Sequence, residues 1–144
     1  MTRRALAAAV AMAAALGAGL PALAAQDAPA APTKGEAELA RVLKGREAGA
    51  PLRCIRSLGF GQPMRTIDGT AYIFGQGDTI YVQRTTRPQD ISRRFALSIK
   101  RQETTSGVEI CRTDVAETFD RALGVPRASV IFEDFIPYTR TPRG

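Results

Sequence analysis

The chain has 144 residues, with 20 Lys or Arg against 14 Asp or Glu, two cysteines and no histidine. The lack of histidine excludes Ser-His-Asp and Cys-His catalysis, and it excludes the common zinc sites, which with two cysteines would still need imidazole or carboxylate ligands. The sequence also lacks a Cys-x-x-Cys pair and a P-loop, so neither thioredoxin-type thiol exchange nor P-loop phosphate binding is indicated.

The N-terminus has the layout of a secretory signal peptide. Arg3 and Arg4 precede an uncharged, alanine-rich run that ends before Pro21, and small residues follow. A positive start, an apolar core and a small-residue cleavage site define such a signal. A membrane anchor is the alternative, but alanine is far less apolar than the residues of real spans. We therefore expect a Sec-type signal peptide over 1–25 and export of the mature chain.

The mature chain is expected to be one domain behind a short linker. Residues 26–33 are small or polar with two prolines, which is typical of a flexible linker, and 34–144 have the length of one domain. Without the two arginines of the signal, 18 basic residues face 14 acidic ones, a net charge of +4. This mild charge predicts no nucleic-acid partner, and no membrane span is expected after cleavage.

The first ordered element is predicted to be an amphipathic helix over 34–44. Thr33 followed three residues later by Glu36 has the spacing of a capping box, and Gly45 can end the helix. Its apolar face consists of Leu39, Val42 and Leu43.

The next segments read as strands. A short strand is expected at 51–55, and the stretch 64–85 contains two turn signals, Asp68-Gly69 and the glycine-rich run 75–78. Asp-Gly favours a tight hairpin because it tolerates positive φ. Two turns predict a meander of three antiparallel strands.

The side chains of this meander separate into two faces, because neighbours in a strand point to opposite sides. One face is aliphatic and is expected to be core. The other carries Tyr72, Phe74 and Tyr81. A helix covering this aromatic face is the favoured interpretation, since mixed domains commonly place a helix on a sheet. The alternative is an exposed aromatic ledge for a ligand, which makes Tyr72 and Tyr81 candidate binding residues.

An arginine-rich segment follows, with Asp90 as its only acid. Its basic residues are Arg84, Arg87, Arg93 and Arg94. Guanidinium groups there could bind a lipid head group, a sugar acid or a phosphate, with Arg93 and Arg94 as candidates. The alternative, a solvated loop, is the commoner outcome. A half-buried strand over 95–100 is predicted next from its alternation.

The C-terminal part is predicted to hold a strand at 108–111, a helix between Asp114 and Gly124, and a last strand over 128–135. Asp114 has the position of a helix cap, and the helix is expected to cover a face of the sheet. The last strand is expected to be interrupted at Glu133-Asp134, and Pro137 predicts no regular structure beyond it.

Cys54 and Cys111 are expected to form a disulfide. Their even number in an exported chain favours pairing over two free thiols.

Four short motifs occur in order behind the signal peptide: "IDGT" (67–70), "ICRTD" (110–114), "GVPRA" (124–128) and "DFIPYT" (134–139). In these motifs the chain resembles a family of small, uncharacterised exported proteins of proteobacteria. The resemblance implies export to the periplasm of a Gram-negative bacterium and paired cysteines. It carries no assigned activity and transfers no catalytic residue.

The remaining candidate binding residues are polar residues of these motifs: Arg112 and Asp114 beside the second cysteine, and Asp68 in the hairpin. A helix cap, a turn or a surface ion pair is the alternative for each. No metal ligands and no cofactor are indicated.

The whole pattern predicts an α+β domain with an antiparallel sheet of five or six strands, one helix before the sheet and one before the last strand. The leading function is a non-enzymatic periplasmic binding or envelope-associated accessory module, whose partner is an anionic envelope component or another periplasmic protein. The alternative is a carboxylate-dependent hydrolase acting on envelope material. Its candidate acids are Asp114, Glu117, Asp120, Glu133 and Asp134.

Overall fold

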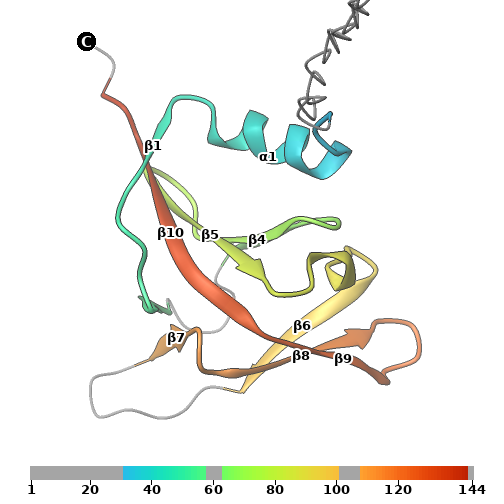
Figure 1. Ribbon diagram of the computed structural model, residues 1–144. Helices are drawn as coiled ribbons and strands as arrows, with labels where there is room; N and C mark the ends of the chain where they lie inside the picture. Colours follow the sequence, from blue (N-terminus) through green and yellow to red (C-terminus); the bar gives the residue numbers. More distant parts are fainter. Residues whose placement is uncertain (1–30, 58–62, 101–107, 143–144) are drawn as a thin grey trace, which may run out of the picture. The chain divides into compact units, whose positions relative to one another are not determined.

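A computed structural model describes residues 31–57, 63–100 and 108–142 of the chain (Figure 1). The predicted signal peptide and most of the predicted linker lie outside these residues. Within them, the domain is built mainly from antiparallel strands, with ten strands in three sheets and one α-helix. The predicted antiparallel sheet structure is therefore confirmed in general form, whereas the predicted numbers of strands and helices are wrong.

Helix α1 (Lys34–Leu43) begins where the sequence predicts and ends one residue earlier. Thr33 Oγ1 accepts a hydrogen bond from the Glu36 N–H at 3.2 Å, which is the expected cap. The Glu36 carboxylate does not complete the capping box. It accepts two hydrogen bonds from the Arg84 guanidinium instead, at 2.8 and 3.1 Å, so this helix start is tied to a strand of the sheet below.

The largest sheet has five strands in the order β1-β10-β5-β4-β3. Its strands are β1 (Arg46–Ala48), β3 (Met64–Ile67), β4 (Ala71–Phe74), β5 (Thr79–Thr85) and β10 (Phe132–Arg140). The predicted meander is confirmed as β3-β4-β5. Gly69 at the first turn has φ 63°, and Gly75 and Gly77 at the second have φ 83° and 85°. Glycine adopts such angles without the steric penalty of a Cβ.

Two smaller sheets complete the domain. One pairs β2 (Cys54–Arg56) with β7 (Glu109–Cys111). The other has the order β6-β8-β9, with β6 (Phe95–Lys100), β8 (Val115–Asp120) and β9 (Pro126–Val130). The short 3-10 turn η1 (Pro88–Asp90) lies between β5 and β6.

The prediction of a second helix between Asp114 and Gly124 is wrong: this segment forms β8 and the turn that leads to β9. Its residues also fit a two-residue period, because Ala116 and Thr118 are buried while Val115 is exposed. Pairing with β6 on one side and β9 on the other favours the extended form over the helical one. Gly124, with φ 66°, belongs to the turn and not to a helix end.

The last predicted strand is divided, and it extends further than expected. β9 and β10 are separate strands, and the pairing of β10 with β5 shifts between Phe132 and Phe135, near the predicted interruption. The bulge leaves the Glu133 carbonyl to accept from Gln83 Nε2 at 2.6 Å.

Pro137 does not end the regular structure, contrary to the prediction, because β10 continues to Arg140. The Gly49 N–H donates to the Pro137 carbonyl at 2.8 Å. The hydrogen-bonding side of Pro137 therefore faces the flank of β10 on which β1 has already ended, at Ala48. The N–H that proline lacks therefore costs no bond to β5, which lies on the other flank.

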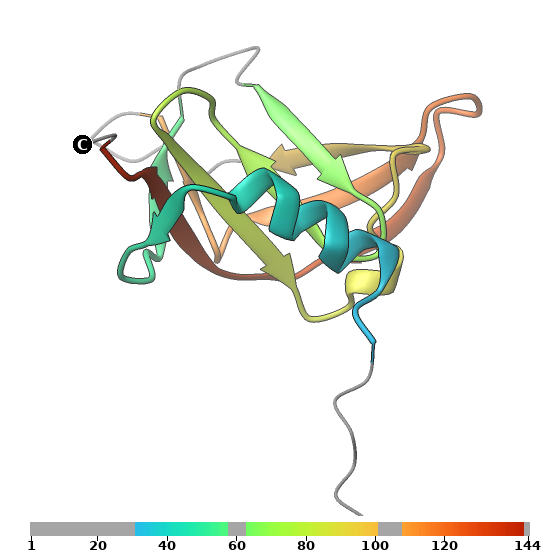
Figure 2. The ribbon, with the colours of Figure 1, turned by 90° about the horizontal axis from the view of Figure 1, so that it is seen from above.

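Two apolar cores lie on the two faces of the five-stranded sheet. The aliphatic face packs under α1, with Leu39 against Ile67, Ile73, Ile80 and Val82, and Figure 2 shows α1 lying across these strands. Gly35 fits closely against the β3–β4 turn, because an added Cβ would clash with Thr70 Oγ1. The opposite, aromatic face packs against the two smaller sheets. A helix therefore covers the face opposite to the predicted one.

Candidate functional site

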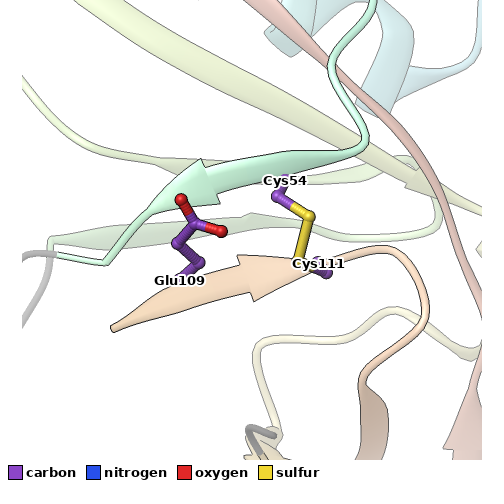
Figure 3. A group of neighbouring side chains, drawn as sticks. All are labelled: Cys54, Glu109 and Cys111. Atoms are coloured by element: carbon purple, nitrogen blue, oxygen red, sulfur yellow. A yellow bond between two sulfur atoms is a disulfide. The ribbon is translucent and has the colours of Figure 1, made fainter. Parts of the chain in front are cut away.

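The predicted disulfide is confirmed. Cys54 and Cys111 lie directly opposite each other on β2 and β7 and are bonded. The Glu109 carboxylate lies on the same face, and its oxygen and the two sulfurs are within 4.8 Å of one another (Figure 3). The two cysteines could bind a metal ion only as thiolates, and both sulfurs are engaged in the disulfide. In this oxidised form the group of three residues acts as a covalent tie between strands.

Arg112 and Asp114, the candidates beside Cys111, have structural partners. Arg112 Nη1 donates to Asp134 Oδ1 at 2.9 Å, in an ion pair whose side chains are about one-third exposed. Asp114 is buried, and its Oδ2 accepts from the Cys111 N–H at 2.8 Å. Because no helix follows, Asp114 closes a tight turn after the disulfide and caps no helix.

Asp68 and Arg93 are brought together by the fold. The Arg93 N–H donates to Asp68 Oδ1 at 2.6 Å, and Arg93 Nη2 donates to both carboxylate oxygens of Glu38 at 2.6 and 2.7 Å. The hydrogen bond to Glu38 is the main reason that the pKa of Arg93 is raised. Arg93 thus joins α1 to the β3–β4 hairpin, and its charge is already matched by acids.

The arginine-rich segment is mostly engaged in ion pairs. Arg84 binds Glu36, and this hydrogen bond lowers the pKa of the Glu36 carboxyl. Arg87 pairs with Asp90 at 3.4 Å. Arg94, in contrast, is exposed, and only its backbone N–H has a described contact, with Ser92 Oγ at 3.3 Å.

The aromatic ledge does not exist as an exposed surface. Tyr72 is 2% exposed and packs in the core between the sheets, and Tyr81 is half-buried against the same core. Burial, together with the negative charge of Asp90, raises the pKa of Tyr72 to about 12.

We expect this burial to make the protein less stable at high pH. Tyr72 in the folded protein stays protonated up to about pH 12, whereas in the unfolded chain it ionises near pH 10. The stability that depends on neutral Tyr72 is therefore complete below about pH 10 and is lost as the pH rises toward 12. An ultraviolet titration of the folded protein should show a late phenolate phase that is missing in Tyr72→Phe. A phase that persists in that variant would contradict the assignment.

A groove of about 520 Å³ opens beside the C-terminal end of α1. Its volume is within the range of small-molecule sites. It is lined by residues of α1 and of all five strands of the large sheet, and by the β4–β5 turn. The lining residues on which the argument depends are Val42, Arg46, Met64, Arg65, Ile73, Ile80 and Arg140. We call this surface the basic groove.

The basic groove carries three arginines on one face of the sheet. Arg46 and Arg140 are directly opposite each other in the β1–β10 pair, and Arg65 is paired with Ile73 on β3 and β4. Like charges opposite each other in a sheet are destabilising. Among the described residues, neither Arg65 nor Arg140 makes an ion pair, and no acid lines the groove. The positive charge therefore has no described protein counterpart.

Arg46 is held in place by backbone carbonyls. Its Nη2 donates to the Gly77 carbonyl at 2.7 Å, and its Nη1 donates to the carbonyls of Asp78 and Tyr138. These bonds fix the β4–β5 turn against β1 and orient the guanidinium beforehand. Arg46 is thus both a structural tie and a fixed positive charge at the rim.

The floor of the basic groove is apolar. Ile73 and Ile80 belong to the core under α1, and Val42 on the helix packs against that core. A second hollow of about 430 Å³ adjoins the groove and shares Val42, Arg46 and Arg140 with it. It adds Lys44 to the basic rim. The site therefore combines a cationic rim with an aliphatic floor.

The sequence interpretation missed the arginines of the groove. Arg65 had a readable signal, because it shares the parity of Ile67 in β3 and so falls on the aliphatic face, where an arginine is unusual. Arg46 and Arg140 had none, because their juxtaposition depends on the pairing of the first strand with the last.

Comparison of the chain with protein-family models, with curated proteins and with solved structures found no match in any of the three. Within the residues that the structure describes, no helix has the length and apolar character needed to cross a membrane.

Proposed function

We propose that this protein is a non-enzymatic binding module of the bacterial envelope that holds an anionic molecule with an apolar part in the basic groove. The observation that carries the proposal is the set of three arginines above an aliphatic floor with no acid in the lining. The layout of the N-terminal signal and the Cys54–Cys111 disulfide support an exported location, since disulfides persist in oxidising compartments.

The chemistry of the groove selects its ligand class. Guanidinium groups bind carboxylates and phosphates through paired N–H donors. Met64, which is 38% exposed, and the half-buried Val42 supply apolar surface beside the floor for an acyl chain or a similar apolar group. A fatty acid or a phosphate ester with an acyl chain has both features, so we infer that the ligand is an anionic amphiphile.

Four of the five candidate acids of the alternative hydrolase have other partners in the described structure, and the fifth, Glu133, is exposed. Asp134 pairs with Arg112, Glu117 with Lys100, and Asp114 accepts from a backbone N–H. Asp120 caps the β8–β9 turn. No observation favours hydrolysis over binding.

Binding of a fatty acid by isothermal titration calorimetry tests the proposal. The variant Arg65→Gln/Arg140→Gln should weaken binding at least tenfold, because each lost charge-assisted hydrogen bond contributes about 1.5–3 kcal/mol. These two arginines are exposed strand residues without ion pairs in the described part of the chain, so the variant should remain folded.

The matched control is Arg53→Gln/Arg56→Gln, which removes the same charge from exposed positions outside the groove. It should bind the fatty acid like the wild type. Equal weakening in both variants would indicate a general effect of charge and would contradict a site in the groove. If only the groove variant binds more weakly, mass spectrometry of the organic anions that copurify with the exported protein would identify the natural ligand.

A further inference from the structure

The turn between β8 and β9 lies at an outer end of the domain (Figures 1 and 2). An exposed leucine, Leu123, belongs to this turn. Leu123 is 71% exposed, and Val125 beside it is also exposed. A single exposed leucine is common on protein surfaces and carries no conclusion alone. The hydrogen bonds of the turn and the arginines at the same end of the sheet make this leucine a candidate contact residue.

The turn is held rigidly by its own hydrogen bonds. Asp120 Oδ1 accepts from the N–H groups of Ala122 and Leu123 at 2.9 and 3.2 Å. The Gly124 N–H donates to the Asp120 carbonyl at 2.8 Å, and the Asp120 N–H donates to the Val125 carbonyl at 3.0 Å. The backbone of the turn is therefore fixed while the leucine side chain stays outside the core.

Three arginines lie at the same end of the β6-β8-β9 sheet. Phe95 pairs with Asp120, so Arg94, just before Phe95, and Arg121, just after Asp120, both lie at this end. Arg127 on β9 places its guanidinium 5.3 Å from the centre of the Phe95 ring. In the described part of the chain, none of the three makes an ion pair. The carboxylate of Asp120 is directed to the turn.

We propose that this end of the domain is a peripheral attachment site for an anionic lipid surface. The site, which we call the hairpin tip, consists of Arg94, Arg121, Leu123 and Arg127. A leucine entering the boundary between headgroups and acyl chains, with arginines around it bound to anionic headgroups, is the combination that peripheral membrane segments use. A protein partner fits less well, because one protruding leucine among cations offers no broad apolar patch.

The inference relies on the proposed function only in placing the chain beside a membrane, and it does not use the basic groove. Sedimentation of the full exported chain with lipid vesicles tests it. The protein should bind vesicles that contain phosphatidylglycerol, and not vesicles of phosphatidylcholine alone. Binding should weaken with added salt, because counterions screen exposed charges.

Two variants separate the roles of the leucine and of the arginines. Leu123→Ser should lower the partition coefficient about tenfold, since it removes the inserted apolar side chain. Arg94→Gln/Arg121→Gln should lower it roughly thirty-fold, given the usual contribution of a basic residue near an anionic surface.

The control variants are Val115→Ser, which changes an exposed apolar residue at the other end of β8, and Arg53→Gln/Arg56→Gln, which removes two charges from exposed positions outside both the hairpin tip and the basic groove. Both should bind vesicles nearly as the wild type does. The proposal is overturned if neutral vesicles bind equally well, if no vesicles bind, or if Leu123→Ser binds like the wild type. It is also overturned if Leu123→Ser alters only the oligomeric state in sedimentation velocity, since the tip would then be a contact between copies. Loss of fatty-acid binding without loss of vesicle binding would affect the proposed function alone.

Discussion

Replacing both cysteines, in Cys54→Ser/Cys111→Ser, is expected to lower the free energy of unfolding by about 4 kcal/mol. The disulfide closes a long loop, because its cysteines are 57 positions apart in the sequence. The closed loop lowers the conformational entropy of the unfolded chain. Without the disulfide the unfolded chain regains this entropy, so the folded state is less stable relative to the unfolded state. For a domain of this size the change is comparable with the whole stability.

Urea denaturation of the oxidised wild type, the reduced wild type and the double variant measures this effect. The reduced wild type and the double variant should unfold at similar urea concentrations, both much lower than that of the oxidised wild type. A variant that loses less than about 1 kcal/mol would show that hydrogen bonds between β2 and β7 are sufficient to hold this small sheet.

Phe135→Ala is expected to lower the free energy of unfolding by about 3–5 kcal/mol. Phe135 is 0% exposed and packs edge-on against Phe74 and Phe132, with ring centres 5.8 and 6.1 Å away. Truncation removes apolar contacts and leaves a cavity that rigid strands on both sides cannot fill. Phe135 also exchanges backbone hydrogen bonds with Leu52, next to β2, so the cavity would lie where the sheets meet.

Leu123→Ala is the matched control, because Leu123 is an apolar residue that is mostly exposed. Its effect on stability should stay within about 0.5 kcal/mol, since its side chain gains little from folding. Thermal unfolding followed by circular dichroism compares the two variants. Similar changes in both would contradict the position of Phe135 in the core.

The elements that the sequence predicts correctly are those whose signals are local. Thr33 and Glu36 mark the start of α1, and Gly69 marks the β3–β4 turn, because a cap or a tight turn depends on residues a few positions apart. The disulfide follows from a count of two cysteines and the expected compartment.

The segment 115–123 shows where local signals fail. Its apolar residues suit one face of a helix, and its alternation also suits a strand, so the neighbours decide. Strands β6 and β9 supply hydrogen-bond partners on both flanks of β8, which a local pattern cannot reveal. The prediction that a helix covers the aromatic face is wrong for the same reason, because the smaller sheets cover this face.

The candidate site depends even more on tertiary pairing. The predicted residues Asp68 and Arg93 do meet, but Glu38 joins them and completes a structural ion-pair cluster. Neither a solvated loop nor an anion site describes most of the arginine-rich segment, because its acid partners Glu36 and Glu38 lie in α1, far away in the sequence. Of the groove arginines that lack such partners, Arg46 and Arg140 could be recognised only in the folded chain, because the β1–β10 pairing brings them together.

The pairing of β1 with β10 also affects when the domain can fold. The first strand of the domain bonds to the last, so the five-stranded sheet is completed only after almost all of the domain has been made. Sheets that depend on such distant contacts fold slowly, typically in milliseconds to seconds. Arg46 and Arg140 face each other across this last pairing, and the basic groove therefore forms only in a full-length domain. A chain that loses its final strand to a protease would lose its fold and its site together.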